Sequence, residues 1–249
     1  MSNCYVGINK IHIVQSNINN GAVPILFIHG AGETGSVWEY ITYKKFNGFK
    51  QIVIDLPGHG KSPGDGFRSI EGYADFVESV VIELGLNGFI LAGHSMGGAI
   101  ALQYALNFQN KLKGLILIST GAKLIIPIEL LKIVKNNGTF YEYTYSQGVP
   151  FDIIKKAEAE YYKTNYMIRY YDLLACNQFD IIDKLNRIAV KTCILCGEND
   201  VITPPEYSEY LHENIKDSQL FLINNASHMV LWEQPDRVCQ GICNFLKKI

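Results

Sequence analysis

Short, largely apolar runs recur along the chain and predict β-strands. They lie at residues 23–28, 51–56, 88–92, 112–118, 191–196 and 219–223. A strand that is apolar on successive residues is typical of a sheet covered on both faces, which is the usual setting of parallel strands. Residues 4–15 alternate more loosely around Gly7 and Asn9, and this pattern predicts a hairpin at the edge of the sheet.

Helical periodicity fills several of the intervals between these runs. Apolar side chains recur at helical spacing over residues 69–84, behind a serine that can cap the helix and ahead of Gly85, which can end it. Residues 96–106 and 235–249 give two further helices. Because strands alternate with helices over most of the chain, we expect a doubly wound, mainly parallel α/β sheet with right-handed crossovers.

The segment 123–183 breaks this alternation, because it carries helical patterns and no convincing central strand. We therefore expect a core of residues 1–122 and 184–249 with a helical cap inserted at 123–183. The segment holds eight of the 15 tyrosines, namely Tyr141, Tyr143, Tyr145, Tyr161, Tyr162, Tyr166, Tyr170 and Tyr171. Such a cap could line an apolar pocket with hydroxyl groups, or its rings could simply pack the cap onto the core.

Composition and charge exclude several partners. The chain of 249 residues has 22 Lys and Arg against 24 Asp and Glu, and no stretch concentrates the basic residues. Nucleic acid is therefore not expected as a partner. No apolar run approaches the roughly 20 residues that a membrane-spanning helix needs, and the N-terminus lacks the pattern of a secretory signal. A cytoplasmic location is the expectation, whereas the oligomeric state is not indicated.

The six cysteines are expected to be free thiols, since their number does not imply a disulfide framework. Cys193 and Cys196 have the spacing of a redox or metal motif. They lie on a predicted strand, however, where side chains three positions apart point to opposite faces. Cys239 and Cys243 fall on the last helix. No second Cys/His pair completes a zinc site, so no metal is expected.

The motif Gly93-His94-Ser95-Met96-Gly97 lies between a predicted strand and a predicted helix. This is the setting in which G-x-S-x-G forms a sharp turn that exposes the serine hydroxyl. The small residues Gly93 and Gly97 avoid collisions in such a turn. Ser95 is therefore the candidate nucleophile.

A serine hydroxyl needs a base and an acid that orients the base. His228 follows the last predicted strand, at the same carboxyl edge of the sheet as Ser95, and is the candidate base. Asp200 follows the strand before it and is the candidate acid, with Glu198 as the second choice. The chain order Ser95, Asp200, His228 is the order found in α/β hydrolases.

An oxyanion also needs preorganised donors. The backbone N–H groups of Ala31 and Met96 are the candidates, because Ala31 lies in a small-residue loop after a strand and Met96 begins the helix after Ser95. Gly30 and Gly32 in that loop resemble a dinucleotide fingerprint only nominally, since Glu33 would face the pyrophosphate. No cofactor is therefore expected.

Taken together, these blocks resemble the α/β-hydrolase superfamily over nearly the whole chain. Residues 29–32 resemble its oxyanion loop, 55–62 the loop after its fourth strand, 93–98 its nucleophile elbow, 197–200 its acid loop and 227–228 its histidine loop. A serine at the elbow disfavours the dehalogenase and epoxide hydrolase branches, which use aspartate. Esterases, lactonases, thioesterases, carbon–carbon bond hydrolases, a menaquinone-pathway synthase and cofactor-free haloperoxidases share these blocks.

The resemblance implies a carboxylic ester hydrolase that acts on small to medium, largely apolar acyl esters through an acyl-enzyme. Gly30, Gly32, His94 and Arg169 are the residues expected to contact the substrate. Glu33 departs from the small or apolar residue expected in the oxyanion loop and would disfavour anionic substrates. One alternative is a carbon–carbon bond hydrolase or menaquinone-pathway-like lyase, in which Arg169 would bind a carboxylate. Another is a ligand-binding receptor that keeps the scaffold without turnover.

Overall fold

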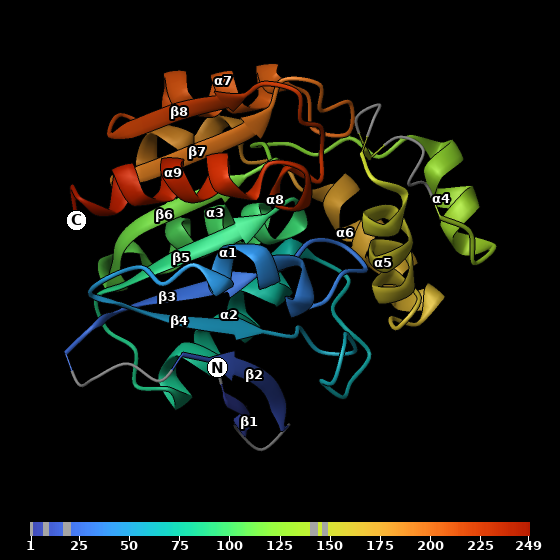
Figure 1. Ribbon diagram of the computed structural model, residues 1–249, viewed down its shortest axis with the longest axis horizontal. Coiled ribbons are helices and arrows are strands. Elements are labelled where there is room, and N and C mark those ends of the chain that lie inside the picture. The colour runs from blue at the N-terminus through green and yellow to red at the C-terminus, as the bar shows by residue number, and fades with distance from the viewer. Residues whose placement is uncertain (1, 7–9, 17–20, 140–143, 146–148) are drawn as a thin grey trace.

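The computed structural model describes residues 2–6, 10–16, 21–139, 144–145 and 149–249. Within these residues an eight-stranded sheet runs through the molecule in the order β1-β2-β4-β3-β5-β6-β7-β8 (Figure 1). The strands are β1 (Ser2–Val6), β2 (Ile11–Gln15), β3 (Val23–Ile28), β4 (Phe49–Ile54), β5 (Phe89–His94), β6 (Leu112–Ile118), β7 (Thr192–Gly197) and β8 (Ser218–Ile223). β1 and β2 form the expected antiparallel edge hairpin, and β2 pairs antiparallel with β4. The remaining neighbours pair in parallel.

Helices cover both faces of the sheet, because successive side chains of each central strand point to opposite sides. On one face, Leu26 and Leu91 pack with α2 (Ile70–Glu83), α3 (Met96–Phe108) and α7 (Pro205–Asn214). On the other, Phe27 and Ile90 pack with α1 (Glu39–Tyr43), α8 (Val230–Glu233) and α9 (Pro235–Leu246). The predicted doubly wound, mainly parallel α/β sheet is confirmed.

The segment between β6 and β7 carries helices α4 (Ile128–Lys135), α5 (Phe151–Tyr161) and α6 (Tyr166–Gln178), which lie together at one end of the sheet, at the right of Figure 1. A single β-bridge joins Lys123 to Asp180, and the ammonium of Lys123 lies 2.8 Å from a carboxylate oxygen of Asp180. The two ends of the segment are therefore held next to one another.

Local sequence rules account for the ends of the main helices. Ser69 accepts a hydrogen bond from the N–H of Gly72 and so caps α2, and Gly85 ends this helix with a φ of +62°. The predicted strands agree with the observed ones to within two residues at either end. The short helix α8 was not predicted, because it is too short to show a helical period.

The described cysteines, from Cys176 onward, carry free thiols, as expected, whereas the side chain of Cys4 lies outside the described residues. Burial raises the pKa of the Cys196 thiol to about 12, which leaves it protonated and unreactive at neutral pH. Within the described part of the chain, none of the helices has the length and apolar character needed to span a bilayer.

Candidate active site

Ser95 sits in a strained turn between β5 and α3. Its φ of 53° and ψ of −117° lie outside the regions that ordinary residues prefer. The turn is tightly crowded, since a Cβ added at Gly93 would lie 2.1 Å from the carbonyl oxygen of Gly97, and one at Gly97 would lie 2.4 Å from that of Ile28. Hydrogen bonds from the Ser95 N–H to the Ile118 carbonyl and from the Thr120 hydroxyl to the Ser95 carbonyl, both 2.9 Å long, hold it in place.

Ser95, His228 and Asp200 form a continuous hydrogen-bonded chain. The Oγ of Ser95 lies 3.0 Å from Nε2 of His228, and Nδ1 of His228 lies 2.9 Å from Oδ2 of Asp200. The three residues follow β5, β8 and β7 and meet at the carboxyl edge of the sheet. In this geometry the imidazole can accept the serine proton while the carboxylate fixes its orientation.

Asp200 is held as an ionised acceptor. The N–H groups of Ile202 and Thr203 donate to Oδ1, and the hydroxyl of Thr203 donates to Oδ2, each over 2.9 Å. Burial opposes ionisation, but the neighbouring His228 and these hydrogen bonds outweigh it and hold the pKa of the Asp200 carboxyl below its usual value. Thr203 was not singled out from the sequence, although a threonine three residues after the candidate acid is a recognisable turn signal.

The two expected oxyanion donors border the same region. Ala31 follows β3 and lines a cavity together with Ser95 and His228. Met96 is the first residue of α3, so its N–H has no partner within the helix and lies at the positive end of the helix dipole. Among the described residues, the N–H of Ala31 has no hydrogen-bond partner either. Both donors remain available for a ligand oxygen.

The partly exposed Glu33 and the buried His94 form a pair that connects the loop of Ala31 with the loop of His228. Oε2 of Glu33 accepts from the Gly30 N–H over 2.7 Å and lies 3.1 Å from Nδ1 of His94. Nε2 of His94 in turn lies 3.0 Å from the carbonyl oxygen of His228 and must therefore donate to it. The pair joins two loops that the candidate mechanism needs in a fixed relation.

The charges of this pair follow from its contacts. Burial disfavours charge on both groups, but the carboxylate of Glu33 raises the pKa of His94, and His94 lowers the pKa of Glu33. An imidazolium that donates from both nitrogens and an ionised carboxylate satisfy every contact. Because the carboxylate of Glu33 is neutralised by His94, its expected repulsion of anionic substrates is reduced.

A second buried network ties the oxyanion loop to α6. Asp172 is fully buried and accepts a hydrogen bond of 2.9 Å from the Gly32 N–H and one of 2.6 Å from the Tyr73 hydroxyl. Its Oδ2 also lies 2.7 Å from Nε2 of His59, whose Nδ1 faces the carbonyl oxygen of Pro57. Burial lowers the pKa of His59, but the carboxylate of Asp172 and these hydrogen bonds raise it above the usual value. Asp172 could not be singled out from the sequence, because its partners are distant in the chain.

The cavity beside Ser95 is small, with a volume of about 50 Å³. We call it the Ser95 cavity. Its lining includes Ala31, Glu33, Ser95, Tyr161, His228 and Met229. Apolar side chains from before α4 and from α4 and α6 close it on the side opposite the sheet. Of the tyrosines expected to line a pocket, Tyr161 does so among the described residues, whereas Tyr162 and Tyr166 are exposed and Tyr141 and Tyr143 lie outside the described residues.

The four residues expected to contact substrate are not among those that line the Ser95 cavity in the described part of the chain. Gly30 and Gly32 use their N–H groups on Glu33 and Asp172, and His94 is buried behind Ser95. Arg169 is buried with its guanidinium 4.4 Å from the ring centre of Tyr161, and it donates to the side-chain oxygen of Asn137. The described contacts of these residues are therefore with neighbouring loops and with residues of the segment between β6 and β7.

Among the described residues, no three His, Cys, Asp or Glu side chains gather in a way that could hold a metal ion. The polar groups around Ser95 are instead arranged as donors and acceptors for one another.

Comparisons with known proteins show the family of the chain. Residues 25–240 match the alpha/beta hydrolase family, and the chain belongs to that family. It is 29% identical to the AB hydrolase superfamily protein YisY of Bacillus subtilis, over 89% of this chain and 91% of that protein. It is 26% identical to 2-hydroxy-6-oxononadienedioate/2-hydroxy-6-oxononatrienedioate hydrolase of Klebsiella pneumoniae, over 96% and 91% of the two chains. A thermophilic esterase from Thermogutta terrifontis superposes with a TM-score of 0.85 at 26% identity, over 99% and 98%.

Proposed function

We propose that this alpha/beta hydrolase is a serine-dependent carboxylic ester hydrolase. The observation that carries the proposal is the hydrogen-bonded chain from Ser95 through His228 to Asp200, with distances of 3.0 and 2.9 Å. The likeness to the Thermogutta terrifontis esterase supports ester hydrolysis as the reaction. The apolar walls of the Ser95 cavity favour a largely apolar ester.

In the proposed mechanism, Ser95 Oγ attacks the ester carbonyl while Nε2 of His228 takes the serine proton. Asp200 stabilises the imidazolium that forms, and the N–H groups of Ala31 and Met96 hold the oxyanion. His228 then gives the proton to the departing alcohol, which leaves an acyl group on Ser95. Water enters, gives a proton to His228 and attacks the acyl carbonyl. The bond from the carbonyl carbon to Ser95 Oγ then breaks, His228 returns the proton to Ser95 Oγ, and the acid is released.

We further propose that residues 123–183 act as a cap over this site. Side chains of α4, α5 and α6 contribute to the Ser95 cavity through Leu130, Tyr161 and Leu173. The β-bridge and the ion pair between Lys123 and Asp180 hold the two ends of the segment together, which supports a unit inserted into the core. The substrate is then enclosed between cap and sheet, where water is excluded and hydrogen bonds to the oxyanion are stronger.

The carbon–carbon bond alternative draws its support from relatives such as the Klebsiella pneumoniae hydrolase. It needs a cation that can receive a carboxylate near Ser95. Arg169 does not line the Ser95 cavity, so ester hydrolysis is the better supported proposal. A receptor without turnover would have no need of the assembled Ser95, His228 and Asp200.

Steady-state hydrolysis of short methyl esters by the wild type, Ser95→Ala and Asp200→Asn tests the proposal. We expect Ser95→Ala to lower kcat by about 10⁴-fold or more, and Asp200→Asn by about 10³–10⁴-fold. Turnover of these esters by Ser95→Ala at the wild-type rate would refute the assignment. A wild type that cleaves a carboxylated dienone and no ester would favour the carbon–carbon alternative.

A further inference from the structure

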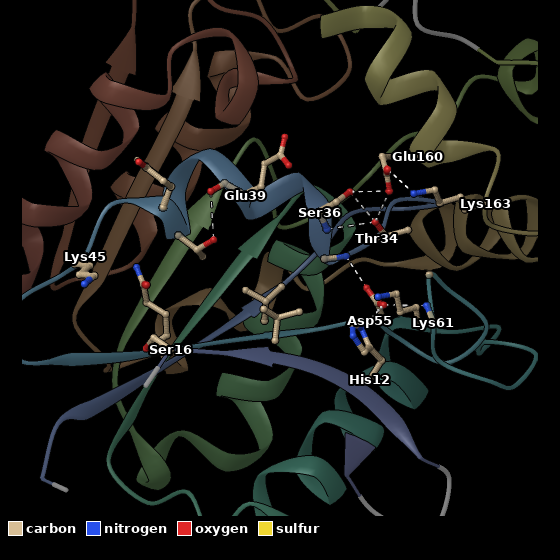
Figure 2. A pocket seen from close by; sticks show the side chains of 17 residues that line it. His12, Ser16, Thr34, Ser36, Glu39, Lys45, Asp55, Lys61, Glu160 and Lys163 are labelled. Carbon is tan, nitrogen blue, oxygen red and sulfur yellow. Dashed lines mark hydrogen bonds and ion pairs between the residues drawn. The ribbon is translucent and has the colours of Figure 1, made fainter. Parts of the chain in front are cut away.

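A large groove lies on the outer side of the segment that follows the oxyanion loop (Figure 2). It has a volume of about 910 Å³, against about 50 Å³ for the Ser95 cavity. We call it the outer groove. Val14 of β2 and Val53 of β4 are among its apolar lining residues, and Thr34, Ser36, Glu160 and Lys61 contribute polar groups to it.

The Ser95 cavity is too small to hold a whole ester substrate with its alkyl chain. A volume of about 50 Å³ accommodates only about three water-sized groups. The reacting ester group alone occupies this space, so any alkyl chain attached to it must continue elsewhere. The volume of the outer groove, in contrast, falls in the range of ordinary ligand sites, about 300–1,000 Å³.

A third, smaller space borders both. It has a volume of about 20 Å³ and shares Glu33, Tyr161 and Met229 with the Ser95 cavity. It also shares Thr34, Ser36 and Glu160 with the outer groove. The same three polar side chains therefore lie between the outer groove and the space that borders the Ser95 cavity.

These three side chains form a polar latch. The hydroxyl of Ser36 donates to Oε2 of Glu160 over 3.1 Å, and the hydroxyl of Thr34 donates to the same oxygen over 3.4 Å (Figure 2). Lys163 pairs with the other carboxylate oxygen of Glu160 from the solvent side. Because Lys163 is more than half exposed, this ion pair adds little to hold the latch closed.

Glu160 can move without its helix. Its side chain is 21% exposed, whereas Ala157 and Tyr161 of the same helix are buried and Ala157 packs in the core. A change of rotamer at Glu160 separates it from Ser36 without exposing Ala157 or Tyr161. The latch can thus open at a cost that substrate binding can supply.

We propose that the outer groove is the binding site for an unbranched alkyl chain of the substrate, which reaches Ser95 past Glu160. Glu160 is then a residue that determines chain-length specificity. The alkyl chain belongs to either the acyl part or the alcohol part of the ester. Two series of esters, one that varies each part, distinguish the two cases. The kinetic part of this inference rests on the proposed ester hydrolysis.

The test measures kcat/KM for methyl esters with acyl chains of two to ten carbons, and for acetates of alcohols of the same lengths. Val14→Trp fills the lining of the outer groove and Glu160→Ala removes the latch. Glu158→Ala, with the same charge change on the same helix, is the matched control. In one of the two series, we expect Val14→Trp to lower kcat/KM for the ten-carbon member about tenfold or more, with the two-carbon member unchanged. Glu160→Ala should raise kcat/KM for the long members, and Glu158→Ala should follow the wild type.

A binding measurement separates this inference from the proposed function. Calorimetric titration of Ser95→Ala with decanoate and with decanol, repeated in the Ser95→Ala, Val14→Trp double variant, needs no turnover. Binding that Val14→Trp weakens supports the groove even if the wild type hydrolyses no ester. The inference would be overturned if Val14→Trp and Glu160→Ala left the chain-length profiles unchanged and if Val14→Trp left the affinities for decanoate and decanol unchanged.

Discussion

Gly32 and Asp172 are 140 positions apart in the chain, yet the N–H of Gly32 donates a hydrogen bond of 2.9 Å to Oδ2 of Asp172. Gly32 follows the candidate oxyanion donor Ala31, and Asp172 lies on α6 of the proposed cap. A Cβ at Gly32 would lie 2.6 Å from the ring of Tyr161 and 2.9 Å from Cγ of Arg169, so only glycine permits this close approach. The orientation of the oxyanion loop therefore depends directly on the position of a cap helix.

Asp172→Asn should lower kcat while leaving KM almost unchanged. The amide keeps one acceptor but places N–H donors against Gly32, Tyr73 or His59, so the loop that carries Ala31 shifts. We expect a loss of about 10–100-fold in kcat, less than the loss of a whole oxyanion donor. Tyr73→Phe, which removes one hydrogen bond and keeps the carboxylate, is the control and should change kcat little. Equal losses in both variants would mean a general structural role.

Glu33→Gln should also act on kcat, through His94 and the backbone of His228. Without the carboxylate, the doubly protonated His94 loses its counter-charge, and the donor to the His228 carbonyl is no longer fixed. Because the carboxylate acts on the reacting groups through His94 and the Gly30 N–H, we expect about a tenfold fall in kcat. Glu78→Gln removes a carboxylate that pairs with Lys111, at a site that does not contact these loops, and serves as the control. A rise in KM with an unchanged kcat would show instead that Glu33 contacts substrate.

His29 should make the fold sensitive to mild acid. Burial, and then the charge of His59, lower the pKa of His29 to about 4, whereas in the unfolded chain it is near 6.5. Protons therefore favour the unfolded state below pH 6.5, and stability falls as the pH falls toward 4. The raised pKa values of His59 and His94 act in the opposite direction, because these groups bind protons more tightly in the folded state; their contribution grows slightly as the pH falls through 6.5 and is constant well below it.

Urea unfolding at pH 6.5 and pH 5 measures this effect. Most carboxylates titrate below pH 5, so we assign to His29 a loss of about 2 kcal/mol in the free energy of unfolding across this interval. His29→Gln, which keeps a donor and an acceptor for Gly30 and Leu56, should show a flatter dependence. Parallel pH profiles for the two proteins would contradict the assignment.

Gly97→Ala should destabilise the fold, although alanine normally stabilises a helix relative to glycine. The added Cβ would lie 2.4 Å from the carbonyl oxygen of Ile28, so β3 and α3 must move apart at a cost of about 3 kcal/mol. At Gly85 a Cβ meets open space, and only the φ of +62° opposes the substitution. Gly85→Ala is therefore the milder control in thermal unfolding. A Gly97→Ala protein as stable as the wild type would show that the turn at Ser95 has more room than the structure gives.

The sequence predicted the elements whose cause is local. The apolar runs, the cap at Ser69 and the turn around Ser95 each depend on residues close in the chain. The sheet order brought Ser95, His228 and Asp200 to one edge, so the loops after three strands could be assigned without knowledge of their contacts.

What the sequence did not predict depends on contacts between distant segments. The role expected for His94 was substrate binding, but its partners Glu33 and His228 lie 61 and 134 positions away, and they turn it into a structural donor. Arg169 was expected near the substrate, and the cap packs it against Tyr161 instead. Asp172 gave no local signal, since a buried carboxylate is recognised only by the donors that surround it.

The most direct test of the central claim is the identification of the covalent intermediate. The protein is mixed with an excess of a methyl ester, quenched with acid within a turnover and digested, and the peptides are analysed by mass spectrometry. We predict an acyl adduct on the peptide that contains Ser95 in the wild type, and no adduct in Ser95→Ala. The adduct should accumulate far more slowly in His228→Ala, which lacks the proton acceptor. Hydrolysis that proceeds without an adduct on Ser95, or an adduct that persists in Ser95→Ala, would contradict the account.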